Sequence, residues 1–196
     1  YHSTQALKSL LKDLSCQDEP PQKWLVVNNS PDSAEEINLE APFPLSVIRG
    51  KEGAGFAEGC NKGLDQLFFE GWNGWVWLLN PDIRLKDYAI VNRLQAVLPS
   101  LPSHALIGTS VFDSAGILEK SAGWIDNGLD FRRRRVSQDL FDSHQEKTVA
   151  LDWISGCSML INPSAHLNKP RFETAFSLYY EDMDFCLRLA QVGSPV

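Results

Sequence analysis

Three carboxylates stand within four positions in the stretch YYEDMDFCLRL, residues 179–189. Like charges this close repel, so a chain that needed only a stable helix would space them out. Acidic groups suit the first turn of a helix, and Asp184 can pair with Arg188 four residues later. These effects explain Glu181 and Asp184, but they do not explain Asp182, which lies close to two tyrosines. Asp182 is therefore the candidate general base, and a capped start of a surface helix is the alternative.

The same stretch predicts the two faces of that helix. Residues three, four or seven apart lie on one face, which groups Glu181, Asp184 and Arg188 on the polar side. The predicted apolar side carries Met183, Leu187 and Ala190.

A second candidate group is NPD at residues 80–82, directly after the apolar run WVWLL. The proline restricts the backbone, so Asn80 and Asp82 are held in set directions. A carboxylate beside an amide oxygen can bind Mg²⁺ or Mn²⁺ when diphosphate oxygens complete the shell. The alternative is an ordinary Asn-Pro-Asp turn.

The loop NNSPDS at residues 28–33 follows another apolar run, WLVV. Asn28 and Asn29 could hydrogen-bond a nucleobase edge or a ribose. Equally, Ser30 or Asp32 could cap a helix after a simple turn.

Two further segments and one charged run have both a functional and a plain interpretation. The glycine-rich GAGFAEGCNKG at 53–63 could bring its backbone close to a ligand, or could be a flexible turn before a helix. In DWISGCSML at 152–160, Trp153 could line a sugar pocket beside Gly156, or could be a core residue. RRRR at 132–135 is either a solvated loop or a clamp for a diphosphate or an anionic lipid headgroup.

Apolar patterns predict the elements that carry these groups. Strands are expected at 24–27, 45–50, 75–80, 105–112, 117–125 and 151–161, the last as a strand or a strand running into a short turn. Helices are expected at 3–15, capped by Ser3 or Thr4, and at 57–69, 88–98, 163–169 and 179–189. This alternation predicts an α/β fold with a mostly parallel sheet, whose ligands lie at the carboxyl ends of the strands. The loops after WLVV and WVWLL fall there.

Composition narrows the classes of function. A net charge of −7 argues against nucleic acid as a partner, which usually requires a basic surface. The four cysteines form no CxxC pair, so free thiols in a reducing compartment are expected. No apolar run approaches the roughly 18 residues of a membrane-spanning helix.

The order of these segments resembles family 2 glycosyltransferases of the GT-A fold, closest to their rhamnosyltransferase-like branch. The matching segments are YHS at 1–3, VVNNSPDS at 26–33, GAGFAEGCN at 53–61, LLNPD at 78–82, DWISGCSML at 152–160 and YYEDMDFCLR at 179–188. They cover nearly the whole chain. The family's first strand would precede Tyr1, so we expect this segment to lack it.

The resemblance implies a role for each matched residue. Asp82 would bind the divalent metal (Mn²⁺ or Mg²⁺), with Asn80 in the place of the motif's first acid. Asp182 would be the base that deprotonates the acceptor hydroxyl, supported by Glu181, with inversion at the anomeric carbon. Nucleotide and nucleotide-sugar contacts would come from Tyr1, Asn28, Asn29, Ser30, Asp32, Gly55, Phe56, Asn61 and Asn80. Trp153 and Gly156 would lie in the acceptor or sugar pocket.

The resemblance also implies a single domain over residues 1–196. Its nucleotide-binding part would span about 1–112, and its acceptor and catalytic part about 113–196. The expected partners are a nucleotide-sugar donor and a glycan or lipid-linked acceptor. The expected location is the cytoplasm, where the protein could sit at the inner face of the plasma membrane.

Two rival functions stay open at this point. One is a sugar nucleotidyltransferase, which would need a basic, glycine-rich signature after a first strand that this segment does not show. The other is a non-catalytic GT-A-like domain that binds nucleotide or glycan, since Asn28 and Asn80 stand where the family usually has acids.

Overall fold

The computed structural model describes residues 3–30, 37–101, 106–119, 121–125, 133–135, 149–166, 168–176 and 178–191. The chain forms two compact units, each assembled from three stretches of sequence. Unit 1 comprises Tyr1–Trp72, Asn80–Pro102 and Arg171–Leu178, and unit 2 comprises Asn73–Leu79, Ser103–Pro170 and Tyr179–Val196. The sequence analysis predicted a single domain whose two functional parts span about 1–112 and 113–196. The stretches of the two units alternate along the sequence because short segments associate with partners far away along the chain.

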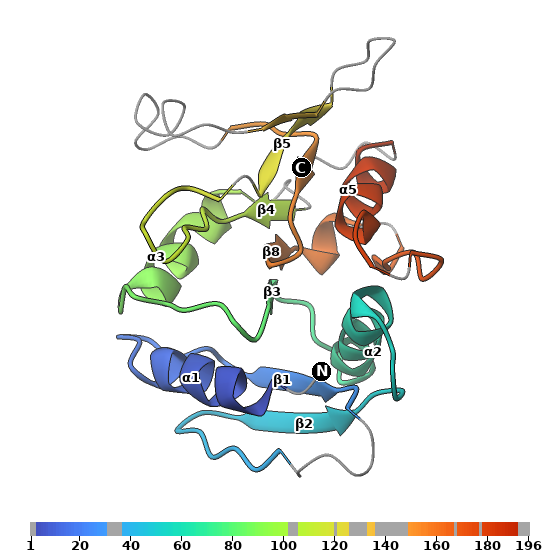
Figure 1. Ribbon diagram of the computed structural model, residues 1–196. Coiled ribbons are helices and arrows are strands. Elements are labelled where there is room, and N and C mark those ends of the chain that lie inside the picture. Colours follow the sequence, from blue (N-terminus) through green and yellow to red (C-terminus); the bar gives the residue numbers. More distant parts are fainter. Residues whose placement is uncertain are drawn as a thin grey trace. The chain divides into compact units, whose positions relative to one another are not determined.

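Unit 1 combines helices with one pair of strands. Its elements are α1 Thr4–Ser15, β1 Trp24–Asn28, β2 Leu45–Arg49, α2 Phe56–Phe69, α3 Ile90–Val97 and a 3₁₀ turn at Leu98–Ser100. The strands β1 and β2 are parallel, with Val26 opposite Val47, and their arrows run the same way in Figure 1. Each α-helix and strand of this unit begins and ends within two residues of its predicted bounds, whereas the 3₁₀ turn was not predicted.

Of the four leucines at helical spacing in α1, Leu10, Leu11 and Leu14 are buried, whereas Leu7 is half-buried. Ser3 is its N-cap residue, but the Ser3 side chain makes no capping hydrogen bond, contrary to the prediction. Asp13 is buried on the same face, which the apolar pattern did not predict. The helix therefore brings a carboxylate into the core of unit 1, where it needs partners.

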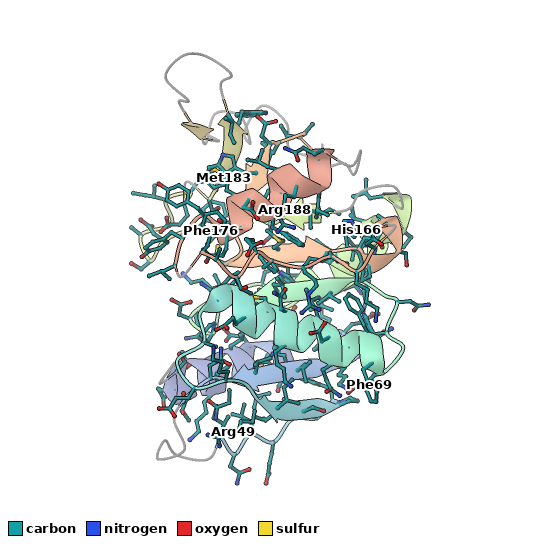
Figure 2. The ribbon with its side chains drawn as sticks, turned by 90° about the vertical axis from the view of Figure 1, so that its right-hand side faces the viewer. Arg49, Phe69, His166, Phe176, Met183 and Arg188 are labelled. Carbon is teal, nitrogen blue, oxygen red and sulfur yellow. The ribbon has the colours of Figure 1, made fainter. Side chains whose placement is uncertain are left out.

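Helix α2 packs against β1 through two glycines one turn apart. A Cβ atom at Gly63 would lie 3.3 Å from Val27 Cγ2, and one at Gly59 would lie 2.8 Å from Asn29 Nδ2. The missing side chains let the helix approach the strand closely. At the far end of the helix, Phe69 is 88% exposed (Figure 2).

Unit 2 contains a three-stranded sheet of order β3–β8–β4, formed by Val76–Leu79, Ser158–Ile161 and Leu106–Gly108. All of β8 is buried. Its one polar side chain, Ser158, accepts a hydrogen bond from Trp77 Nε1 at 3.0 Å and shares another with Thr109 Oγ1 at 2.6 Å. Neighbours on both sides therefore satisfy the buried hydroxyl.

A second sheet of unit 2 has the order β6–β5–β7, formed by Arg133–Arg135, Ala122–Ile125 and Trp153–Ile154. The unit also holds a 3₁₀ turn at Pro163–Ala165 and helix α5, Glu181–Gln191, which packs against β7. The segment 151–161 forms two strands in different sheets, separated by a turn at Gly156 and Cys157. Three of the four arginines of RRRR lie in an edge strand, where the prediction had a solvated loop or a clamp.

The prediction of an α/β fold is confirmed, because the described part contains four α-helices together with strands. The prediction of a mostly parallel sheet does not match the described pairings. Only β1–β2 is parallel, and the other four pairings are antiparallel. Apolar runs indicate where strands lie but carry no information about their direction. Here β8 enters between β3 and β4 from a distant part of the chain and runs against both.

In the described part of the chain, no helix combines the length and apolar character needed to cross a bilayer.

Candidate functional site

The first candidate group lies in unit 1, where β1 ends. Asn28 Oδ1 accepts a hydrogen bond from the Ser30 N–H at 3.0 Å, and the Gly50 N–H donates to the Asn28 carbonyl at 2.9 Å. The Asn28 amide thus closes its own turn, as Asn does after many strands. Gly50, directly after β2, therefore also contributes to this loop.

Asn29 occupies a space formed by two glycines. A Cβ at Gly50 would lie 1.8 Å from Asn29 Oδ1, and Gly59 is the other close neighbour. Asn29 Nδ2 donates to the Ala54 carbonyl at 3.4 Å. Asn29 Oδ1 is buried and has no hydrogen-bond partner among the described residues. A buried acceptor of this kind is costly, so it is the atom of this loop best suited to receive a donor group.

Asn61, Phe56 and Gly55 connect the start of α2 to a distant segment. Asn61 is buried, and its amide donates to the Phe172 carbonyl and accepts from the Phe172 N–H, both at 2.9 Å. The Phe56 and Phe172 rings meet edge to face at 5.7 Å, and Gly55 is the N-cap residue of α2. Both hydrogen-bonding groups of the Asn61 amide are therefore engaged inside the protein. Asp65 and Arg171 pair across the same contact.

The NPD turn belongs to unit 1 and is followed by two residues that hydrogen-bond to helix α1. Asn80 is half-buried and Asp82 is exposed, with the Ile83 N–H donating to the Asn80 carbonyl at 3.2 Å. Just beyond it, Arg84 Nε donates to Asp13 Oδ2 at 2.6 Å. The Leu85 N–H donates to the same oxygen at 3.0 Å.

These hydrogen bonds are accepted by the buried carboxylate of Asp13, which the sequence analysis missed. The hydrogen bonds from Arg84 lower the pKa of Asp13 below its ordinary value of 3.8, outweighing the opposing effect of burial. Gln17, also buried, donates to the Asp87 carbonyl at 2.9 Å and accepts from the Val91 N–H at 3.3 Å. The available signal was the position of Asp13 beside Leu14 on the apolar side of α1, because a carboxylate there is buried only when it has partners.

In unit 2, the structure brings Asp182 together with the segment DWISGC. The Gly156 N–H donates to Asp182 Oδ2 at 3.0 Å, and the Met183 N–H donates to Asp182 Oδ1 at 2.8 Å. Gly156 is buried and Asp182 is half-buried. Two predicted site residues 26 positions apart are therefore in direct contact, and the carboxylate is held by main-chain donors. Such donors fix the direction of the group without a competing side-chain charge.

Cys186, in the same helix as Asp182, hydrogen-bonds to the main chain of Ile154 in β7. Ile154 N–H donates to Cys186 Sγ at 3.5 Å, and the thiol donates to the Ile154 carbonyl at 3.7 Å. Burial, with a smaller contribution from the Asp182 charge, raises the pKa of Cys186 to about 12. Burial also raises the pKa of Cys157, and Asp182 adds to that effect. These thiols stay protonated at neutral pH, as expected for structural cysteines.

The buried face of α5 does not coincide with the side opposite its predicted polar face. It consists of Glu181, Phe185, Cys186 and Leu189. Met183 and Leu187 are only half-buried and Ala190 is exposed, so the side opposite the predicted polar face is not the buried one. The charge pattern grouped Glu181 with the polar side, whereas packing against β7 turns it inward. The predicted pair of Asp184 with Arg188 is present at 2.7 Å.

Glu181 and Trp153 are both buried, with 7% and 6% of their surface exposed. Glu181 Oε2 and Trp153 Nε1 have no hydrogen-bond partner among the described residues. Trp153 therefore occupies the core, the alternative to a sugar-pocket role, because a ring so covered offers no face to a ligand.

The backbone just before α5 is strained. Tyr179 and Tyr180 have φ values of 66° and 71°, in the left-handed region that bulky residues rarely adopt. Their side chains are 71% and 52% exposed. No sequence pattern predicted this conformation. Tyr1 and Asp32, two predicted nucleotide contacts, lie outside the described residues.

The donor set for the predicted metal is limited. In the part of the chain that the structure describes, no three His, Cys, Asp or Glu side chains are arranged to hold a metal ion. The NPD turn offers the exposed Asp82 carboxylate and the Asn80 amide. Such a pair fits a hard cation only when most of its oxygen ligands come from a bound diphosphate and water, as is usual for Mg²⁺.

A comparison with models of known protein families gave no match, and neither did a search among curated proteins.

Proposed function

We propose that this chain is a GT-A glycosyltransferase that moves a sugar from a nucleotide donor to an acceptor hydroxyl with inversion. The observation that carries the proposal is the contact of Asp182 with Gly156. It joins the two segments, DWISGC and EDMD, that the resemblance assigns to acceptor chemistry. A half-buried carboxylate held by main-chain N–H groups has the fixed direction that a general base needs.

The proposal assigns a separate task to each unit. In unit 1, the turn after β1 and the NPD turn would bind the donor nucleotide. A divalent metal, when bound with the donor, would neutralise charge on the leaving diphosphate. In unit 2, Asp182 would accept the proton of the acceptor hydroxyl as the new bond forms. The acceptor would be a glycan or a lipid-linked saccharide, reached from the cytoplasm at the membrane face.

A thermal-shift panel tests donor binding first. The melting temperature is measured with UDP, dTDP and GDP, each with Mn²⁺, Mg²⁺ or EDTA. A ligand that binds only the folded state raises stability by about 2.7 kcal/mol at a hundred times its Kd. We expect a shift with one nucleotide that requires the metal. No shift with any combination would contradict the donor assignment.

Asp182→Asn then tests the base. We expect donor binding to stay unchanged and nucleoside diphosphate release from the matching donor to fall about 10²- to 10⁴-fold, the usual contribution of a general base. Asp184→Asn is the matched control, because Asp184 is a carboxylate two residues away that is paired with Arg188. Equal turnover by Asp182→Asn and the unaltered protein would remove the base assignment. Nucleotide binding without any turnover would favour the non-catalytic alternative.

A further inference from the structure

Helix α1 holds the segment after the NPD turn through two buried polar side chains one helical turn apart, Asp13 and Gln17. Arg84 Nε and Nη2 donate to the two carboxylate oxygens of Asp13, at 2.6 and 2.8 Å, and the Leu85 N–H adds a third hydrogen bond at 3.0 Å. Gln17 binds the main chain further along the same segment. The charged part of this attachment therefore lies directly beside the predicted metal site.

The partner of Arg84 is not the carboxylate nearest to it in the sequence. Asp82 is two positions away. The two Cα atoms are therefore at most about 7 Å apart, a separation that an arginine side chain can span. The guanidinium instead binds Asp13, which is 71 positions away. Among the described residues, the exposed Asp82 carboxylate has no hydrogen-bond or ion-pair partner. Asp13 therefore binds the cationic side chain that is closest to Asp82 along the chain.

Two physical effects favour Asp13 over Asp82 as the partner of Arg84. A bidentate pair matches the planar guanidinium to both carboxylate oxygens and fixes its direction. The Asp13 carboxylate is buried, and a buried charge without a partner costs far more than an exposed one. Arg84 therefore stays with Asp13, and the solvated Asp82 carboxylate is left available to another cation.

We propose that Asp13 is a positioning residue for the cation site of the NPD turn, because it binds Arg84 and so leaves Asp82 unpaired for a divalent metal. The inference rests on the proposed function, under which the metal of the donor complex binds at this turn. Without the Asp13 charge, the Arg84 guanidinium competes with the metal for Asp82. Groups that arrange the surroundings of a metal ligand in this way contribute about 10- to 100-fold to metal affinity.

Water-proton relaxation measures Mn²⁺ binding to the full chain in the presence of UDP, dTDP, GDP or inorganic pyrophosphate. Asp13→Asn removes the charge but keeps an oxygen that can accept the Leu85 N–H. We expect the dissociation constant of the Mn²⁺ complex to rise about tenfold in this variant. Arg84→Gln removes the competing cation and should bind as tightly as the unaltered chain. The double variant Asp13→Asn/Arg84→Gln should recover the affinity that Asp13→Asn loses.

Two control variants make the result specific. Asp82→Asn removes the metal ligand and should lose binding with every probe. Asp87→Asn changes the net charge as Asp13→Asn does, but it releases a different arginine, because Asp87 pairs with Arg93. It should bind like the unaltered chain.

Denaturant unfolding separates this positioning role from a structural one. Breaking the pair of Asp13 with Arg84 from either side should lower stability. A purely structural role therefore predicts weaker metal binding in Arg84→Gln as well, and no recovery in the double variant. If Asp13→Asn does not fold, Arg84→Gln still distinguishes the two roles.

Equal affinity of Asp13→Asn and the unaltered chain would overturn the inference and leave the transferase in place. Weaker binding by Arg84→Gln would also overturn it. Binding of Mn²⁺ pyrophosphate that depends on Asp13 and Asp82, without binding of any nucleotide, would keep the inference and remove the transferase. No binding of any probe to the unaltered chain would overturn both.

Discussion

The predicted binding residues of the two units use their polar groups in different ways. In unit 1, Asn28 closes its own turn and Asn61 bridges both main-chain groups of Phe172. In unit 2, Asp182 is held by main-chain donors, and two exposed tyrosines stand beside it. A polar residue in a motif can therefore close its own turn or connect segments far apart in the chain, and residue type alone does not distinguish the two uses.

The two units also depend on opposite protonation states. Unit 1 relies on an ionised Asp13 that pairs with Arg84, whereas unit 2 relies on a neutral Cys186 that bridges Ile154. Acid should therefore weaken one contact and alkali the other. Three predictions test these differences between the units, and the one with the largest expected effect comes first.

Gly50→Ala should lower the free energy of unfolding by about 3 kcal/mol, the upper end for inserting a methyl group into a packed site. The added Cβ would meet Asn29 Oδ1 at 1.8 Å and Val27 Cγ1 at 3.1 Å. Denaturant unfolding measures the effect. Gly53→Ala is the control, since a Cβ there meets nothing within 4 Å and only its positive φ, 70°, is unfavourable. The Gly53 variant should lose about 1 kcal/mol.

A double-mutant cycle sharpens this prediction. Asn29→Ala removes the atoms that the new Cβ would strike, so Gly50→Ala should cost less in that background. Equal costs in both backgrounds would show that the Asn29 side chain does not occupy the space between the glycines.

Asp13→Asn should lower the free energy of unfolding by about 2 kcal/mol at pH 7, because it removes charged hydrogen bonds to Arg84. The pKa of Asp13 is lowered in the folded state, so its stabilisation is present above 3.8 and is lost as pH falls through the folded value. The gap between the two proteins should therefore close below about pH 3.8. Denaturant unfolding from pH 3 to 7 checks this. A gap independent of pH would contradict the assignment.

Cys186→Ser should change the alkaline limb of the stability curve. The pKa of Cys186 is raised to about 12 from an ordinary 9.0, so the neutral thiol stabilises the fold below pH 9. That contribution is lost as pH rises toward 12, and by pH 10 it has fallen by about 1 kcal/mol. Serine does not titrate there, so the variant should lose less stability between pH 8 and pH 10. Hydrogen exchange of peptides from α5 should report the same difference, and parallel curves would exclude the role of the thiol.

Sequence patterns located most elements because an apolar period depends only on the chain's own spacing. Helices α1, α2 and α5 and strands β1, β2 and β3 begin and end close to their predicted bounds. The residues left between the predicted strands 105–112 and 117–125 form a turn, with the Asp113 N–H donating to the Ile117 carbonyl at 2.8 Å. The contact of Asp184 with Arg188 follows from helical spacing in the same way.

What the sequence by itself determined about this protein is therefore local: its helices and strands, its turns and the chemical types of its candidate residues. Only the tertiary structure decided which strands pair and in which direction, since β8 meets β3 across 81 residues at Trp77 and Ser158. It also decided that Glu181 and Trp153 face inward, that Asp13 is buried with Arg84, and that Gly156 holds Asp182. The physical reason is that each of these depends on a partner remote along the chain, which no local period encodes.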